Sequence, residues 1–376
     1  MINFFGPVNT LGTGVHCYNL ALAYERLTKE SVCLIPPFGN ANLRDEHVDR
    51  WLQNRNDFDV HNPSIMIFDT AFLTQFSGTP RIGYAVFETD ELTLVQLKAV
   101  RSCDHVLVPS TWGQMVLTHH GVKSHVIPEG YDPIKFPVGM EIQTETSVPR
   151  FLHVGKSESR KGTMQVLKCF AEALEENSAN LTMHCENPFM NGGGWDQLQE
   201  ALYDIGFRPV VTPRSGNPLN ERWKRGGLLV RLSFHQDSLS ELYRTHDCGV
   251  FPSKGEGWGL PILECIASGT PAIVGNWSGQ SEFLGTDYPK ELTLAKPNPV
   301  KANDGVWFHG DRGYWYEPTD TDLIARFRWA YANVRDFKST PEWKTAVDQC
   351  RSFTWQNAAE MLQLFLETMC GRKKSV

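Results

Sequence analysis

The fold is decided by one stretch of the sequence, Phe251-Pro252-Ser253-Lys254-Gly255-Glu256-Gly257-Trp258-Gly259-Leu260-Pro261-Ile262-Leu263-Glu264. Its glycines allow a ligand to approach the backbone closely. Pro261 suits the first position of a helix, and Gly269 suits the end of that helix. Residues 255–260 are therefore predicted to form a loop that leads into a helix N-terminus. Free N–H groups and the helix dipole favour an anion there, such as a diphosphate.

The two glutamates of this stretch, Glu256 and Glu264, are eight residues apart. A fully helical segment of that length rises about 12 Å. The acid and base of a glycosidase lie roughly 5–9.5 Å apart, so the spacing disfavours a paired-carboxylate hydrolase. It better suits two contacts with one long ligand. The plainer alternative is a loop, a capped helix and one surface glutamate.

Composition narrows the class of protein. The chain has 376 residues, enough for two to three domains, and a net charge of −7, which argues against nucleic-acid binding over the whole surface. No apolar run approaches the ~18–20 residues of a membrane span, and residues 1–6 lack the features of a signal peptide. The nine cysteines are scattered and never form CxxC, which is typical of reduced thiols in a cytoplasmic protein.

Outside the motif, short apolar runs alternate with helical stretches in two series, which predicts α/β architecture with parallel sheets. The expected strands are 2–7, 31–36, 64–68, 81–87, 105–108 and 125–127, then 150–154, 180–185, 228–232, 248–251 and 271–274. The expected helices are 15–27, 92–101, 112–119 and 161–175. A polar segment at 136–150 predicts a linker. We expect two Rossmann-like domains that face a cleft, at 1–140 and 150–353.

Two further segments bear on this organisation. Residues 354–369 carry an apolar stripe at helical spacing, so a final helix within 354–376 could pack across a domain boundary. Residues 186–227 are expected to be a loop-rich excursion. Residues 207–231 include six basic residues and only one acidic residue, Glu221. Such a patch could bind a polyanionic acceptor. A solvated loop is the favoured alternative, and the tail at 372–374 is too short to anchor a membrane alone.

A second cluster of charged residues, at 154–162, leaves a strand and opens a helix. Lys156, Arg160 and Lys161 lie there, and cations before a helix N-terminus would strengthen its attraction for phosphate. A solvated basic turn is the alternative. A third motif, Gly12-Thr13-Gly14, predicts a glycine-rich turn after the first strand. Because Cys17 stands where a dinucleotide fingerprint has its third glycine, an NAD site is not expected.

A fourth segment runs from a strand directly into acidic residues, at 82–90. Polar groups at the C-terminal end of such a strand face the cleft. Glu88 is therefore a candidate for acceptor binding or proton handling, with Tyr84 and Asp90 beside it. His16 is a further acceptor candidate, although a helix-lining histidine is the plainer interpretation. For Glu88 and Asp90 the alternative is an acidic pair that caps a helix.

The stretch 251–264 resembles the E-x7-E motif of retaining glycosyltransferases with the GT-B fold, in the large family-4 group. The segment at 277–282 is similar to one that follows this motif in the same group. The resemblance implies that Glu256 contacts hydroxyls of the donor sugar and Glu264 the ribose of the nucleotide. It also implies a set of backbone contacts with the sugar and diphosphate, from Gly257, Trp258, Gly259 and Leu260.

The same resemblance assigns roles to the other clusters. Lys156 and Lys161 match a pair of diphosphate clamps, with Arg160 in the donor site, although arginine is commoner at the position of Lys156. The turn at 12–14 would face the donor phosphates and the acceptor. The Glu88 segment resembles a subgroup frequent among O-antigen-type sugar transferases.

The expected activity is transfer of a hexose, with retention of configuration, from a nucleotide-diphosphate sugar of the UDP-glucose or GDP-mannose type. The acceptor would be a hydroxyl of a glycan, a lipid-linked sugar or another molecule. No cofactor and no metal are expected; Asp320-Thr321-Asp322 matches a DxD motif by letters only. The alternatives are a nucleotide-sugar epimerase or a phosphorylase on the same fold, and a non-catalytic sugar-nucleotide-binding protein. The expected location is cytoplasmic, with peripheral membrane contact left open.

Overall fold

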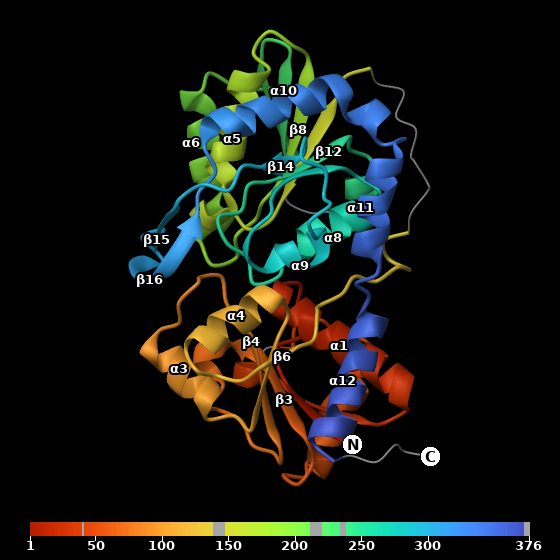
Figure 1. The fold of residues 1–376 in the computed structure, drawn as a ribbon. Helices are drawn as coiled ribbons and strands as arrows, with labels where there is room; N and C mark the ends of the chain where they lie inside the picture. Colours follow the sequence, from red (N-terminus) through yellow and green to blue (C-terminus); the bar gives the residue numbers. More distant parts are fainter. Residues whose placement is uncertain (40, 138–146, 211–219, 234–237, 372–376) are drawn as a thin grey trace.

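Two lobes, each built on its own sheet, make up the molecule (Figure 1). The structure, a computed structural model, describes residues 1–39, 41–137, 147–210, 220–233 and 238–371. The predicted linker at 136–150 falls largely on residues outside this part, as does the basic tail at 372–374. The domain boundaries at 140 and 150 therefore stay a prediction.

The N-terminal lobe contains a six-stranded parallel sheet in the order β2-β1-β3-β4-β5-β6. The strands are β1 (Ile2–Phe5), β2 (Val32–Ile35), β3 (Ser64–Asp69), β4 (Arg81–Val86), β5 (His105–Val108) and β6 (His125–Val126). The helices are α1 (Gly12–Thr28), α2 (Glu46–Gln53), α3 (Leu94–Arg101) and α4 (Thr111–His119), with short 3-10 turns η1 (Pro37–Gly39), η2 (Asn54–Asp57) and η3 (Thr70–Phe72). All six strands predicted for this half are present.

The C-terminal lobe contains an eight-stranded sheet in the order β14-β13-β12-β7-β8-β11-β10-β9, antiparallel only at its β10 and β9 edge. Its strands are β7 (Arg150–Val154), β8 (Ala179–His184), β9 (Arg208–Pro209), β10 (Asn220–Arg225), β11 (Leu228–Ser233), β12 (Cys248–Phe251), β13 (Ala272–Gly275) and β14 (Thr293–Leu294). A separate antiparallel hairpin follows, β15 (Pro299–Asn303) and β16 (His309–Tyr316).

Helices cover both faces of this second sheet, as expected for a parallel α/β arrangement. The helices of this half of the chain are α5 (Thr163–Ala173), α6 (Trp195–Asp204), α7 (Leu239–Arg244), α8 (Leu260–Ala267), α9 (Ser281–Leu284), α10 (Asp320–Phe337) and α11 (Pro341–Arg351), and the final helix, α12 (Trp355–Met369), lies against the other lobe. The short 3-10 turns are η4 (Ser159–Lys161), η5 (Asn191–Gly194) and η6 (Ser278–Gln280).

The excursion predicted at 186–227 is more regular than expected. It contains α6, β9 and β10. Trp195, Leu198 and Leu202 form the buried face of α6, whereas the glycines before them in the sequence favour a loop. Several basic residues of 207–231 therefore lie on edge strands, and residues 211–219 fall outside the described part. Strand β10 is three strands from β7, about 14 Å away at ~4.8 Å per strand. Arg225 is already paired with Glu175.

The last helix, α12, returns to the N-terminal lobe and packs beside α1 (Figure 1). Trp355 stacks on His16 with ring centroids 5.6 Å apart, and Phe365 packs against His105 and His125. Before α12, the Tyr131 N–H donates to the Phe353 carbonyl at 3.0 Å. This end of the chain thus fastens the two lobes together.

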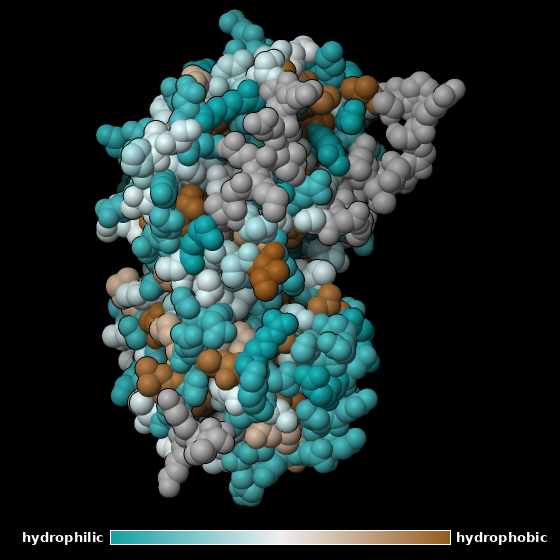
Figure 2. All heavy atoms as spheres, turned by 90° about the vertical axis from the view of Figure 1, so that its right-hand side faces the viewer, coloured by the Kyte–Doolittle hydropathy of each residue, from teal (hydrophilic) through white to brown (hydrophobic). Residues whose placement is uncertain are grey.

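The face shown in Figure 2 is largely polar. Figure 2 shows apolar residues only in small groups on the face that it presents, and the molecule narrows between the lobes. Among the described helices, none combines the length and the apolar character that crossing a bilayer would require.

Candidate active site

Three loops meet where the two lobes approach each other. Each follows the C-terminal end of a parallel strand: β4 in the N-terminal lobe, and β7 and β12 in the C-terminal lobe. Side chains after such ends collect at one edge of a sheet. A Cβ on Gly255 would lie 2.3 Å from the Glu88 carbonyl oxygen, and one on Gly257 would lie 2.4 Å from Val86 Cγ1. Only glycine permits this approach of the lobes.

Glu256 lies at the centre of this region and is 5% exposed. Its Oε1 accepts hydrogen bonds from Lys161 Nζ at 2.5 Å and Ser253 Oγ at 2.5 Å, and its Oε2 accepts one from Arg160 Nη1 at 3.1 Å. Burial alone would raise the pKa of this carboxyl group. The two cations more than offset that effect and lower the pKa to about 2, so Glu256 is ionised at neutral pH.

Arg160 joins the loops to one another. Its guanidinium donates to the Gly255 carbonyl at 2.7 Å and to Glu158 Oε1 at 2.7 Å, in addition to Glu256. Its Nη2 also lies 3.6 Å from Glu88 Oε1 in the other lobe. The structure therefore brings together Arg160, Lys161, Glu256 and Glu88, all of which were predicted as site residues.

Lys156, the other predicted clamp, stands at the edge of this network. Its Nζ lies 3.4 Å from Glu158 Oε2 and 5.2 Å from the centroid of the Phe189 ring, and its side chain is 32% exposed. Glu158, which pairs with both Lys156 and Arg160, was not predicted. In the sequence, its position two residues before Arg160 was the available indication that it belongs to the site.

The predicted loop-to-helix transition is confirmed in geometry. Gly259 precedes α8 with φ of 102°, Pro261 lies in its first turn, and Gly269 follows the helix with φ of 85°. The segment at 277–282 braces this loop, because the Glu256 N–H donates to Ser278 Oγ at 3.0 Å and the Gly279 N–H donates to the Glu256 carbonyl.

The second glutamate of the motif, Glu264, is buried on α8. Its Oε2 accepts a 3.4 Å hydrogen bond from the Tyr243 hydroxyl. Burial raises the pKa of Glu264 to about 8, so this carboxyl group is mostly protonated at neutral pH. The side chain of Trp258 is buried in the core, where it packs against Phe283 and Phe353.

Two expectations for the N-terminal lobe are corrected. Gly12, Thr13 and Gly14 form the first turn of α1 and not a loop before it. Tyr84 is fully buried and its hydroxyl donates to the Ile127 carbonyl, so it does not face the cleft. The hydrogen bond satisfies the buried phenol, which leaves it no polar group for an acceptor.

A buried polar pair lies beneath the cleft. His16 is 1% exposed, its Nδ1 lies 3.5 Å from Glu129 Oε1, and its Nε2 has no hydrogen-bond partner among the described residues. Burial lowers the pKa of His16 to about 3. Burial, together with the negative charge of Glu256, raises the pKa of Glu129 to about 8. Both groups are thus mostly neutral at neutral pH.

Other contacts close the cleft on either side. Asp90, expected near the acceptor, accepts a 2.7 Å hydrogen bond from the Tyr314 N–H of strand β16. On α4, the Thr111 N–H donates to Glu282 at 2.7 Å. The described residues contain no group of three or more metal-ligating side chains. The DxD-like Asp320 and Asp322 begin α10, where Asp320 contacts α5.

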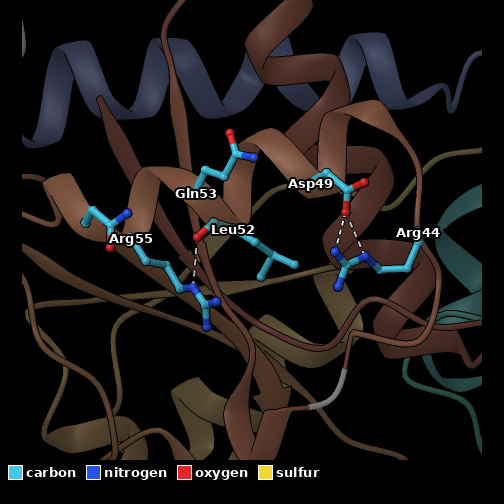
Figure 3. Close-up of a pocket in the computed structure, with 6 residues that line it drawn as sticks. Arg44, Asp49, Leu52, Gln53 and Arg55 are labelled. Carbon is cyan, nitrogen blue, oxygen red and sulfur yellow. Dashed lines mark hydrogen bonds and ion pairs between the residues drawn. The ribbon is translucent and has the colours of Figure 1, made fainter.

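A pocket lies on another part of the N-terminal lobe, along α2 and η2 (Figure 3). Its lining residues are Arg44, Asp49, Leu52, Gln53, Arg55 and Asn56. Arg44 and Asp49 pair with each other there, and Arg55 donates to the Leu52 carbonyl at 2.9 Å. No predicted site residue lines this pocket, so we assign the chemistry to the interface between the lobes.

Comparison with solved structures identifies the fold. The solved structure of sucrose-phosphate synthase from Thermosynechococcus elongatus superposes with a TM-score of 0.68 at 14% identity, over 99% of each chain. The Anabaena protein HepE in complex with UDP-glucose gives 0.64 at 13% identity, over 98% of this chain and 99% of that one. These likenesses establish the GT-B fold that the sequence predicts.

Residues 228–307 match the family model described as glycosyl transferases group 1. An uncharacterized glycosyltransferase of Methanocaldococcus jannaschii, MJ1607, is 24% identical over 62% of this chain and 58% of its own. The chain spans about half the length of the curated relatives that it matches. The chain therefore has the GT-B fold, and residues 228–307 are similar to the group 1 glycosyl transferases, in agreement with the resemblance noted in the sequence.

Proposed function

We propose that this protein is a retaining glycosyltransferase that moves a hexose from a nucleoside diphosphate sugar to a hydroxyl acceptor. The observation that carries the proposal is the ionised Glu256, held by Lys161 and Arg160 at the C-terminal ends of β7 and β12. A carboxylate suits the hydroxyls of a sugar, and the two cations beside it suit a diphosphate. Both requirements of a nucleotide sugar are thus met within one cluster.

The cluster also suits the chemistry of group transfer. The bond from the sugar to the diphosphate breaks, and negative charge develops on the leaving phosphate. Lys161 and the partly exposed Lys156 would stabilise that charge, and the N-terminus of α8 adds its dipole. The acceptor would enter on the side of Glu88, in the N-terminal lobe. The retaining course and the hexose are part of the proposal.

The donor base is the first property to test. Thermal shifts with UDP, GDP, ADP and NAD and with their sugar forms provide the experiment. A ligand at ~100 times its Kd adds about 2.7 kcal/mol to the free energy of unfolding. A shift with UDP or GDP supports the proposal and names the base. A shift with NAD alone, or the absence of a shift with every nucleotide tested, would contradict it.

The stereochemical course is read from the product. Incubation with the nucleotide sugar so identified, with water as acceptor, releases free sugar whose first-formed anomer is visible by NMR. The same anomer as in the donor supports retention. A sugar nucleotide converted without release would instead indicate an epimerase.

A further inference from the structure

Two exposed aromatic side chains meet beside the candidate active site. Phe189 is 56% exposed and Trp307 is 49% exposed. Their ring centroids lie 5.8 Å apart in an edge-to-face arrangement. Phe189 follows β8, whereas Trp307 lies in the turn of the β15–β16 hairpin, so segments distant in the sequence build this aromatic pair. Large apolar surfaces left in water at one place are typical of a binding site.

The turn that presents Trp307 is held in a fixed shape. Asp304 Oδ1 accepts hydrogen bonds from the N–H groups of Val306, Trp307 and Phe308 at 2.9, 2.8 and 2.9 Å. The Asp304 N–H in turn donates to the Phe308 carbonyl at 2.9 Å. A turn whose backbone is held in this way loses little conformational entropy when a ligand packs on it.

The aromatic pair is continuous with the site. Lys156 Nζ lies 5.2 Å from the Phe189 ring centroid and 3.4 Å from Glu158, which holds Arg160. On the hairpin side, burial would raise the pKa of Asp304, but the three backbone N–H groups and the charge of Arg160 lower it. Phe189 therefore lies beside the active-site charge cluster, and Trp307 contacts Phe189.

The hairpin also faces the acceptor side of the cleft. At its base, the Tyr314 N–H bonds to Asp90 of the N-terminal lobe. Figure 1 shows β15 and β16 projecting from the C-terminal lobe at the level where the lobes meet. Glu264, to which the resemblance assigns the nucleotide ribose, lies on α8 and contacts Tyr243 of α7. The aromatic pair lies instead beside Lys156.

We propose that Phe189 and Trp307 form a subsite for a saccharide ring of the acceptor. The inference rests on the proposed function, because it names the acceptor class for the same site. The C–H groups of a pyranose carry partial positive charge and pack on the negative face of an aromatic ring. Its hydroxyls can reach the charged groups that flank the pair, Lys156 and Asp304. An acyl chain would gain contact with only two rings and would desolvate both charges.

Saturation-transfer NMR tests the subsite without requiring catalysis. The probes are α-mannotriose, maltotriose and chitotriose, each at millimolar concentration. We expect the wild-type protein to transfer saturation to at least one of them. Trp307→Ala and Phe189→Ala should each raise its Kd by about three- to tenfold, the value of one aromatic contact. Trp307→Phe should retain binding.

Val306→Ala is the matched control, because Val306 is 61% exposed in the same turn and is not part of the pair. Its Kd should equal that of the wild type. Nucleotide-dependent thermal shifts are measured on every variant. Saccharide binding that depends on the pair, in a protein that binds no nucleotide, would support the subsite and contradict the proposed function.

Three results would overturn the subsite. The first is a wild type that binds none of the three probes. The second is a Kd unchanged in Trp307→Ala. The third is a nucleotide shift lost in both alanine variants but kept in Val306→Ala, which would place the pair in the donor site.

Discussion

Arg160 Nη2 lies 3.6 Å from Glu88 Oε1, and this contact joins the two lobes beside Glu256. Arg160 is buried and anchored on the C-terminal lobe by Glu158, Glu256 and the Gly255 carbonyl. The Glu88 side chain is 35% exposed, so it keeps access to the cleft. One guanidinium therefore links the carboxylate assigned to the donor with the carboxylate assigned to the acceptor.

Glu88→Gln should lower transfer and leave nucleotide binding intact. The amide keeps the shape of the side chain but removes the charge that faces both Arg160 and an incoming hydroxyl. General acid–base contributions are worth roughly 10²–10⁴-fold, so we expect kcat to fall by about 100-fold or more if Glu88 handles the proton. Steady-state kinetics measure the fall in transfer, and the thermal shift with the nucleotide measures whether binding is intact.

Glu91→Gln, the same change three residues away, is the control for Glu88 and should behave as the wild type. Unchanged turnover in Glu88→Gln would remove Glu88 from the reaction. Loss of the nucleotide shift would assign it to the donor.

Lys161→Ala should weaken nucleotide binding. Arg160 and Ser253 would still hold Glu256, so the fold should persist. A hydrogen bond to a charged group contributes about 1.5–3 kcal/mol, which predicts a rise in Kd of roughly ten- to hundredfold. Calorimetric titration with UDP or GDP measures it. Lys168→Ala, on the exposed side of α5, is the control. Equal affinities for the two variants would contradict the clamp.

Local signals in the sequence predicted the loop-to-helix transition of the motif correctly. Glycine and proline act on their own backbone, so the loop at 255–260 and the start of α8 followed from residue type alone. The same reliance on residue type led to a wrong prediction for Gly12–Gly14. Glycines are poor helix formers, and Leu11, the residue before the helix, makes no side-chain cap. Nothing local marks that turn as helical.

Contacts between distant segments were not predictable. Tyr84 is buried together with His16, which α12 covers through Trp355, and that helix comes some 270 residues after Tyr84 in the sequence. The alternation of apolar and polar residues along a strand distinguishes the two faces of the sheet, but it does not indicate which face a later helix covers. The burial of Glu129 and its raised pKa were equally unpredictable, since the burial depends on α1 and the pKa depends in part on Glu256.

Stability should fall as the pH rises from about 6.5 to 8. Glu129 has its pKa raised to about 8 in the folded protein, against 4.5 as its ordinary value. The folded state therefore binds more protons than the unfolded state in this range, and the stabilisation present at low pH is lost as the pH approaches 8. His16, with its pKa lowered to about 3, has the opposite effect, which ends near pH 6.5.

Glu129→Gln should reduce the loss in free energy of unfolding between pH 6.5 and 8. The reduction is up to ~2 kcal/mol, because one proton contributes 1.36 kcal/mol per pH unit. Urea unfolding at the two pH values measures the difference. Glu264, whose pKa is also raised to about 8, should account for a similar share. Glu46→Gln, at a side chain that is 86% exposed, should leave the pH dependence unchanged. An equal loss in Glu129→Gln and wild type would show that Glu129 is already ionised.

Gly257→Ala should separate the lobes without unfolding either one. The added Cβ would lie 2.4 Å from Val86 Cγ1 and 3.1 Å from the Phe87 carbonyl, so the N-terminal lobe must move back. Transfer requires both lobes at one site, and a misplacement of about 1 Å can cost roughly 100-fold in rate. We expect loss of turnover, with nucleotide binding kept, and a larger radius of gyration by small-angle scattering.

The matched control for Gly257 is Gly113→Ala on α4, where the nearest atom is 3.4 Å from the new Cβ and φ is ordinary. A second variant tests the cause. Val86→Ala removes the methyl group that the Gly257→Ala side chain meets first, so the double variant should recover part of the lost turnover. If Gly257→Ala is inactive and the double variant recovers nothing, the donor itself needs the space that the added Cβ fills at position 257. The close approach of the lobes would then be a consequence of the glycine and not its purpose.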